Sequence, residues 1–428
     1  MRKISMYELM EGIECLRNGK KRRCTLLGIG PMSRPVIEAS LLAAKESDFP
    51  VMFIASRNQI DAYELGGGYV CGWNQKDFVR EISLIAEKIG FEGLYYICRD
   101  HGGPWQRDAE RKDALPEDEA MEIAKSSYVE DLVSGFDLLH IDPTKDPHCS
   151  GVIPLDTVIS RSVELIAHVE SERIRRELPP VAYEVGTEET NGGLTSIGAF
   201  EDFIRKLNAE TSGRGLPDPL FIVGQTGTLT RLTENVGHFD AEAGMKLAQA
   251  AARYGTGLKE HNADYLSDQT LLIHPYLGIT AANVAPEFGV EETKTYLLLN
   301  RVEESLYKQS VIDKCSDFRA VIARQTVISG KWKKWMTPDK TALSTEDILS
   351  DTGLTSLITE TAGHYTFEDP DVKEAKEKMF RNLSVAGMDP DSVVLYKLKN
   401  SIRRYAECFN MTGLTKELSA LFSLSFPV

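Results

Sequence analysis

Several short apolar segments of this chain end in carboxylate, imidazole or amide side chains. The residues of this pattern are, in chain order, Asp100, His101, His140, Asp142, Glu184, Glu188, Gln225, His261, Asp264 and Asn283. Buried charges are costly unless they are paired or form part of a site, so we interpret the set as one constellation. Imidazole together with carboxylate suits Zn²⁺ or Mn²⁺, and either metal can act as a Lewis acid on a ketose carbonyl and hydroxyl.

The stretch "LYYICRDHGGP" shows the pattern most clearly. Its apolar run predicts a buried strand, which ends in Arg99, Asp100 and His101 before a Gly-Gly-Pro turn. Three ionisable groups at that point are either paired structurally or part of a site, and we interpret them as one wall of a sugar pocket. Neighbouring carboxylates in a dry pocket can have their pKa values pushed apart, so that one serves as base and another as acid.

The segments that carry these groups alternate with amphipathic, helix-like stretches, many of which end in Gly. The expected strands cover residues 24–30, 50–56, 93–99, 138–144, 182–188, 219–227, 256–262 and 279–286. Eight strand–helix units in succession predict an α/β fold, the (β/α)₈ TIM barrel, with its site at the C-terminal ends of the strands. An open doubly wound sheet is the alternative, but no GxGxxG follows the first strand and no P-loop is present, which weakens its nucleotide-binding form.

The two ends of the chain differ from this alternating part. Near the N-terminus, apolar residues at helical spacing from Met6 to Leu16 predict an amphipathic helix. After about Val311 the alternation stops and helical patterns dominate. We therefore predict a barrel domain with an N-terminal helix over 1–310 and a mostly helical C-terminal cap over 311–428. The Trp and Lys cluster at 332–335 could bind an anion, but packing of the cap on the barrel is the favoured interpretation.

Composition excludes some classes of partner. The chain has 428 residues and a formal net charge of −15, which argues against broad nucleic-acid binding but not against a small anionic substrate. No apolar run approaches the roughly 20 residues of a membrane span. Seven Cys without CxxC pairs indicate reduced thiols and a cytoplasmic protein.

Several motifs occur in an order that resembles a known family. They are "NQI…GGGYVCGWNQKDF", "RDHGGPWQRD", "LLHIDPT", "YEVGTEE…GG", "EHNADY" and "WKKW". Together they resemble the Z-subunit family of tagatose-bisphosphate aldolase (GatZ/KbaZ-type), and the resemblance covers most of the chain. A fainter likeness runs to the class II fructose- and tagatose-bisphosphate aldolases, which are metal-dependent (β/α)₈ barrels.

The fainter likeness implies roles for individual residues. His101 and His261 would be metal ligands, with Glu184 near the metal. Asp100 would carry the hydroxyl proton at C4, and Asn283 would contact substrate. The chain departs from the aldolase pattern at Gln225, where those enzymes have a third His, and in "NADYLSD", where they have a Gly-rich phosphate loop.

Other residues complete the predicted site. Asp142, Glu184, Glu188 and Asp264 are candidates for a second catalytic acid or base. The predicted substrate-binding residues are Asn58, Gln59, His140, Gln225, Asp264 and Asn283.

The expected function is a metal-dependent ketose or ketose-phosphate enzyme of retro-aldol type. A C4 epimerase of the tagatose 6-phosphate/fructose 6-phosphate class is preferred. The alternative is a tagatose-bisphosphate aldolase subunit, either catalytic or a non-catalytic stabiliser of a separate aldolase chain. A kinase is poorly supported because no ATP-binding loop is visible. The expected partners are a small ketose or ketose phosphate and further copies of the chain in a homo-oligomer.

Overall fold

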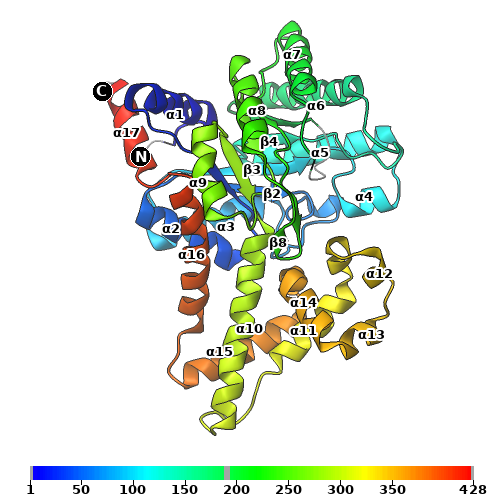
Figure 1. Cartoon of the computed structure of the whole chain (residues 1–428), viewed down its shortest axis with the longest axis vertical. Coiled ribbons are helices and arrows are strands. Elements are labelled where there is room, and N and C mark those ends of the chain that lie inside the picture. Colours follow the sequence, from blue (N-terminus) through cyan, green and yellow to red (C-terminus); the bar gives the residue numbers. More distant parts are fainter. Residues whose placement is uncertain (1–2, 188–192, 426–428) are drawn as a thin grey trace.

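The computed structural model of the chain describes residues 3–187 and 193–425, and eight parallel strands form a closed barrel in it (Figure 1). The strands are β1 (Leu26–Ile29), β2 (Val51–Ser56), β3 (Tyr95–Gly102), β4 (Leu138–Ile141), β5 (Ala182–Gly186), β6 (Phe221–Val223), β9 (Gly257–Glu260) and β10 (Ala281–Val284). Each strand pairs with its neighbour along the chain, and β1 closes the ring against β10. The predicted (β/α)₈ barrel is confirmed.

Helices connect the strands in the order expected from the alternating pattern. They are α2 (Arg34–Ser47), α3 (Gln75–Ile89), α4 (Asp108–Lys112) with α5 (Glu117–Ser134), α6 (Leu155–Arg175), α7 (Ile197–Gly213), α8 (Ala241–Arg253) and α9 (Asp268–Leu277). Local signals fix several ends: the Ser33 and Asn74 side chains cap α2 and α3, and Gly90 and Gly135 end α3 and α5 in the left-handed conformation. A short helix, η1 (Tyr63–Leu65), and a hairpin of β7 (Thr230–Arg231) and β8 (Glu234–Asn235) lie in loops after strands.

The N-terminal helix is α1 (Met6–Lys20), which begins with a capping box between Ser5 and Glu8. It buries Met6, Leu9, Ile13 and Leu16, as the helical spacing predicts. No helix of the described residues is both long and apolar enough to cross a bilayer.

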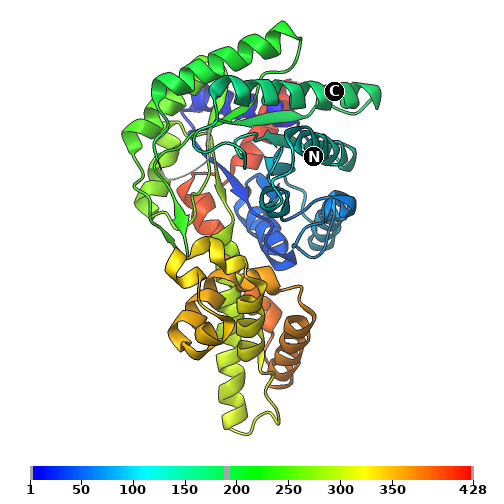
Figure 2. The ribbon, with the colours of Figure 1, turned by 90° about the vertical axis from the view of Figure 1, so that its right-hand side faces the viewer.

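The C-terminal region is helical, as predicted. After β10, α10 (Pro286–Lys308) runs away from the barrel, and the following helices form a separate lobe below it (Figure 2). The elements of this region are α11 (Phe318–Ser329), η2 (Lys331–Trp335), α12 (Pro338–Thr341), α13 (Thr345–Ser350), α14 (Thr352–Ala362), η3 (Gly363–Thr366), α15 (Pro370–Val385), α16 (Pro390–Cys408) and α17 (Leu414–Ser425). A small second core of Val327, Trp332, Met336, Ile348, Ile358 and Ala362 stabilises the lobe.

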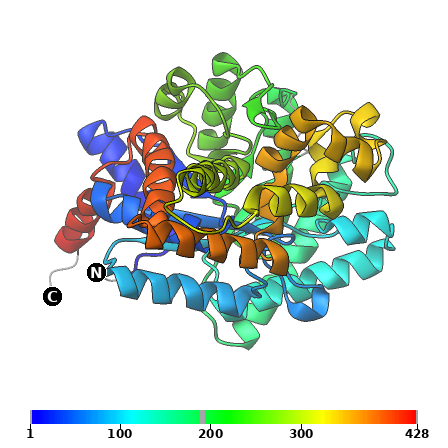
Figure 3. The same cartoon turned by 90° about the horizontal axis from the view of Figure 1, so that it is seen from below.

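The chain returns to the barrel through its last two helices. Helix α16 packs along α2 and α10 and also contacts α9, so it lies in the outer layer of the barrel (Figure 3). Helix α17 packs against α1, which brings the two ends of the chain to the same side of the molecule (Figure 1). The division into domains at residue 310 stays a prediction, and these contacts place part of the C-terminal region on the barrel itself.

Candidate active site

A cavity of about 480 Å³ opens where the barrel strands end at their C-terminal side. Most of the predicted site residues line it: Asn58, Gln59, Asp100, His101, His140, Asp142, His261, Asp264 and Asn283. They come from the ends of β2, β3, β4, β9 and β10 or from the loops that follow. Parallel strands in a barrel deliver these ends to one rim, which is why residues distant in sequence meet here.

Two other predicted residues, Glu184 and Gln225, are not among the described residues that line the cavity, and the structure does not describe the third, Glu188. Glu184 is fully buried in β5 and contacts the cavity-lining residues His261, at 2.8 Å, and His140, at 3.6 Å. Gln225 is buried and does not appear among the residues that line the cavity in the described part of the chain; its backbone N–H donates to Thr195 Oγ1 at 2.7 Å. Glu188 lies outside the described residues. The roles assigned to all of these residues stay predictions.

Three imidazoles form the centre of the site. One ring nitrogen from each of His101, His140 and His261 lies within 4.8 Å of the others. His261 Nδ1 and His101 Nε2 are 3.1 Å apart. The sequence placed His140 among substrate-binding residues, and the structure sets it beside the two predicted ligands. Three neutral imidazoles are a donor set that suits Zn²⁺ or a similar divalent ion.

The outer nitrogens of two of these rings contact carboxylates. His101 Nδ1 lies 2.6 Å from Asp142 Oδ2, and His261 Nε2 lies 2.8 Å from Glu184 Oε1. A carboxylate on the far nitrogen fixes the tautomer and turns the other nitrogen toward the centre, as in metal sites that use histidine. The cluster therefore fits a divalent metal held by His101, His140 and His261.

A local break in β3 lets consecutive residues share the cavity. Side chains alternate across a strand, so Asp100 and His101 would ordinarily point to opposite faces. The register with β4 shifts between Arg99 and Gly102, and His101 has a φ of 44°, which is uncommon for a residue other than glycine. The turned backbone N–H of His101 donates to His140 Nδ1 at 3.1 Å. This bulge brings both Asp100 and His101 into the site.

Arg99 follows the ordinary alternation and lies behind the strand. Its guanidinium is fully buried, binds both carboxylate oxygens of Asp131, and donates to the backbone carbonyls of Ala55 and Ile60. The interpretation of Arg99 as part of the pocket wall is wrong, because neighbouring positions of a strand face opposite sides.

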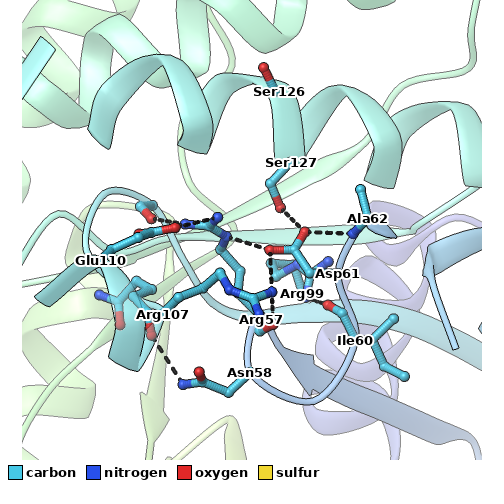
Figure 4. A network of polar contacts seen from close by, with 12 residues as sticks. Arg57, Asn58, Ile60, Asp61, Ala62, Arg99, Arg107, Glu110, Ser126 and Ser127 are labelled. Carbon is cyan, nitrogen blue, oxygen red and sulfur yellow. Dashed lines mark hydrogen bonds and ion pairs between the residues drawn. The ribbon is translucent and has the colours of Figure 1, made fainter. Parts of the chain in front are cut away.

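Arg99 belongs to a buried ionic network that supports the site from behind (Figure 4). At its centre, Asp61 accepts hydrogen bonds from Arg57 Nε at 3.0 Å and from Ser127 Oγ at 2.8 Å. Burial alone would raise the pKa of Asp61, but the nearby arginines hold it below its ordinary value. The network fixes the loop after β2, which carries Asn58 and Gln59 into the cavity.

Asp100 is the carboxylate at the centre of the imidazole cluster. Its Oδ1 lies 4.0 Å from His101 Nε2, 3.8 Å from His140 Nδ1 and 3.8 Å from His261 Nδ1. The Asn283 amide donates to the same oxygen at 3.1 Å. Burial alone would raise the pKa of Asp100, but the charges of His101 and His261 hold it far below its ordinary value. Asp100 is therefore ionised at neutral pH.

Lys259 is a site residue that the sequence analysis missed. It is fully buried in β9, and its ammonium lies 2.5 Å from Glu184 Oε2. Burial opposes ionisation of Glu184, yet Lys259 and then His140 bring the pKa of that carboxyl down to about 2. A lysine inside the apolar strand pattern, two residues before His261 and hence on the same face, was the available signal.

Asp264 has a different electrostatic setting from Asp100. Its Oδ1 accepts the backbone N–H groups of Ala285 at 3.0 Å and Glu287 at 2.8 Å, at the start of α10. Burial, reinforced by the charge of Glu287, raises the pKa of Asp264 to about 7. A carboxyl with this pKa can hold or release a proton near neutral pH.

The C-terminal lobe also reaches the cavity. Lys334 and Trp335 of η2 and Tyr365 of η3 line it opposite the barrel loops. Trp332 of the same cluster is buried in the lobe's own core, as expected for packing of the cap. The cluster thus combines a packing residue with residues that face the site.

Fold and site together define a TIM-barrel protein with an imidazole and carboxylate pocket suited to a hydroxyl-rich ligand. The chain belongs to the D-tagatose-1,6-bisphosphate aldolase subunit GatZ/KbaZ-like family, whose sequence profile matches residues 14–408. No curated protein sequence is similar enough to this chain to count as a match.

Solved structures with a similar fold include two from the chemistry of tagatose and tagaturonate. One is described as a probable tagatose 6 phosphate kinase from Sinorhizobium meliloti 1021, with a TM-score of 0.70 and 20% identity over 94% of this chain and 98% of that chain. The other is the glycerol-complexed fructuronate-tagaturonate epimerase UxaE from Cohnella laeviribosi, with a TM-score of 0.55 and 12% identity over 91% of this chain and 81% of that chain.

Proposed function

We propose that this protein is a metal-dependent C4 epimerase of ketose 6-phosphates, with tagatose 6-phosphate and fructose 6-phosphate as its pair. The observation that carries the proposal is the position of Asp100, whose Oδ1 lies within 4.0 Å of a nitrogen of each clustered imidazole. Family membership and the likeness to an epimerase of keto sugars support the substrate class.

Asp100 is the first base in this proposal. It removes the proton of the C4 hydroxyl, the C3–C4 bond breaks, and its electron pair passes into an enediolate on the C1–C3 fragment. The C4–C6 fragment becomes an aldehyde. A divalent ion held by His101, His140 and His261 would stabilise the negative charge that develops on the ketose oxygens. The same steps begin an aldol cleavage, so the fate of the aldehyde separates epimerase from aldolase.

Epimerisation needs the aldehyde to rotate and to be attacked on its other face. A second group must then return a proton to the new C4 oxygen. Asp264 fits this role best, because it lines the cavity and its pKa of about 7 allows it to carry a proton. Asp142 is held by His101 and Thr144, and Glu184 is held by Lys259 and His261, so neither is free to exchange protons with a sugar.

The second candidate is a subunit that supports a separate aldolase chain. The family description favours it, and α9 exposes Leu272, Ile273 and Tyr276 as an apolar surface of the kind found at interfaces. This role predicts no turnover alone but tight association with an aldolase chain and activity in the mixture.

The test is an assay of purified protein with tagatose 6-phosphate, fructose 6-phosphate and the matching bisphosphates, with and without Mn²⁺ or Zn²⁺. An epimerase interconverts the 6-phosphates and, in D₂O, retains the original hydrogen on C4. An aldolase releases a trappable aldehyde from a bisphosphate.

The matched variants are Asp100→Asn and Asp113→Asn, because Asp113 is an exposed residue outside the cavity. We expect Asp100→Asn to lose a factor of about 10²–10⁴ in kcat and Asp113→Asn to behave as the parent. The proposal fails if all substrates return unchanged, or if Asp100→Asn keeps the parent rate.

A further inference from the structure

Two lysines of the C-terminal lobe lie at or beside the cavity, where the barrel and the lobe meet: Lys334 lines it, and Lys331 lies over the rings of two tyrosines that line it. The contact is made by Tyr69, from the glycine-rich loop after β2, and Tyr365, whose rings pack edge to face with centroids 4.9 Å apart. Both tyrosines line the cavity. The loop can come this close because Gly68 packs directly on the backbone of Gln59, where any side chain would clash.

The ammonium groups of Lys331 and Lys334 cluster around these rings. Lys331 Nζ lies 4.8 Å from the Tyr69 ring centroid and 5.7 Å from that of Tyr365. Lys334 Nζ lies 4.6 Å from the Tyr365 ring centroid, and Lys334 itself lines the cavity. The two tyrosines thus place two cations at the wall of a pocket that also contains the histidine cluster.

Neither lysine forms a direct ion pair within the described part of the chain, and Asp108 acts on Lys331 only from a longer distance. Across residues 3–187 and 193–425, the contacts of both ammonium groups are with aromatic rings and none is an ion pair, although the chain carries a net charge of −15. The Trp335 indole, beside them, has a buried N–H without an acceptor in this same part of the chain. Burial and then the charge of Lys334 lower the pKa of Lys331, and the more distant Asp108 opposes them. Two neighbouring like charges without a direct ion-pair partner favour a ligand with two negative charges.

We propose that Lys331 and Lys334 bind the phosphate at the C6 end of the ketose, with its C3–C4 bond placed at Asp100. This inference rests on the proposed function for the identity of the sugar. Phosphate is favoured over a carboxylate because it brings a second negative charge to the two ammonium groups. The C-terminal lobe then selects phosphorylated substrates, while the barrel supplies the reacting groups.

The test is a calorimetric titration of binding, which does not depend on turnover. The probes are fructose 6-phosphate, fructose, inorganic phosphate and fructuronate, which carries a carboxylate at C6. The variants are Lys334→Ala, Lys331→Ala, the double variant, and Lys333→Ala as the matched control. Lys333 belongs to the same helix but contacts the Trp332 ring and does not line the cavity.

We expect each single variant to bind fructose 6-phosphate about 10-fold more weakly and the double variant about 100-fold more weakly, with no change for fructose. Lys333→Ala should match the parent. The proposal is overturned if the double variant binds fructose 6-phosphate as tightly as Lys333→Ala, or if the parent binds neither phosphate probe. Stronger binding of fructuronate than of fructose 6-phosphate would overturn the preference for phosphate.

The Asp100→Asn variant separates this inference from the proposed function. It should bind fructose 6-phosphate with the parent affinity because Asp100 acts on C4. Lysine-dependent phosphate binding without any epimerase or aldolase turnover would refute the proposed function alone. Turnover that does not depend on either lysine would refute the phosphate site alone.

Discussion

Lys259 Nζ lies 2.5 Å from Glu184 Oε2 inside the barrel, where both side chains are fully buried. The other carboxylate oxygen of Glu184, Oε1, contacts His261 Nε2. His261 Nδ1 in turn lies 3.1 Å from His101 Nε2. The ion pair therefore supports the imidazole cluster from below. A buried carboxylate needs such a partner, because its desolvation is otherwise uncompensated.

Replacement of Lys259 should destabilise the fold strongly. In Lys259→Met the Glu184 carboxylate stays buried without its cation, and we expect a loss of about 3–5 kcal/mol in the free energy of unfolding. The loss should grow as pH rises through the new, higher pKa of Glu184. Urea denaturation at pH 5 and pH 8 measures both effects. The double variant Lys259→Met/Glu184→Gln is the control, since it removes both charges and should recover much of the loss. Equal losses in the two variants would refute the pairing argument.

The imidazole cluster should bind one divalent ion per chain. We expect His261→Ala and His101→Ala to lose tight Zn²⁺ or Mn²⁺ binding, because each removes one of three ligands. Equilibrium dialysis of chelator-treated protein with elemental analysis measures the stoichiometry. His238→Ala is the matched control, because His238 is exposed and lies outside the cavity. Undiminished binding in His261→Ala would place the metal elsewhere.

Metal affinity should rise with pH in the neutral range. Burial opposes protonation of His101, yet Asp100 and Asp142 raise its pKa to about 9, so a proton competes with the metal below that pH. Asp142→Asn removes one of these charges and should shift the rise in affinity to lower pH. At high pH, where His101 is deprotonated, the variant should still bind the metal about 10–100-fold more weakly than the parent, because Asp142 orients the His101 ring. Competition titrations from pH 6 to pH 9 test both effects, and identical curves for parent and variant would contradict them.

Asp264 should make the fold less stable as pH rises. The folded chain binds its proton with a pKa of about 7, whereas the ordinary value is 3.8. The bound proton contributes to the free energy of unfolding in full below pH 3.8, and this contribution is lost as pH rises to about 7. The total loss is up to roughly 4 kcal/mol. Asp264→Asn keeps the acceptor for the backbone of α10 and cannot ionise. The melting temperature of Asp264→Asn relative to that of the parent should therefore rise between pH 5 and pH 8. A constant difference across this range would contradict the raised pKa.

A chain that ends at residue 310 should not fold on its own. It lacks α16, which covers α2, and α17, which covers α1. The α16 residues Leu398 and Ile402 are fully buried in the whole chain, and without them the α2 face that α16 covers becomes exposed. We expect the fragment 1–310 to aggregate or to bind a hydrophobic dye, whereas the full chain does not. A soluble fragment with a cooperative unfolding transition would instead support two independent domains.

The sequence by itself determined the barrel and the strand ends that form the site. Apolar runs alternating with capped helical stretches specify strand–helix units, and eight such units close a cylinder whose C-terminal rim collects Asp100, His140 and His261. These features are local or periodic, so they can be recognised without knowledge of long-range contacts.

Tertiary structure alone decided how individual side chains are used. Strand alternation predicts that Asp100 and His101 diverge, and only the bulge against β4 brings both into the cavity, leaving Arg99 behind the strand. The pairing of Lys259 with Glu184 joins strands 75 residues apart. Lys334 reaches the cavity, with Lys331 over the Tyr69 ring beside it, because the lobe that follows α10 meets the barrel there. Such contacts depend on register and on the path of the chain through space, which no local pattern encodes.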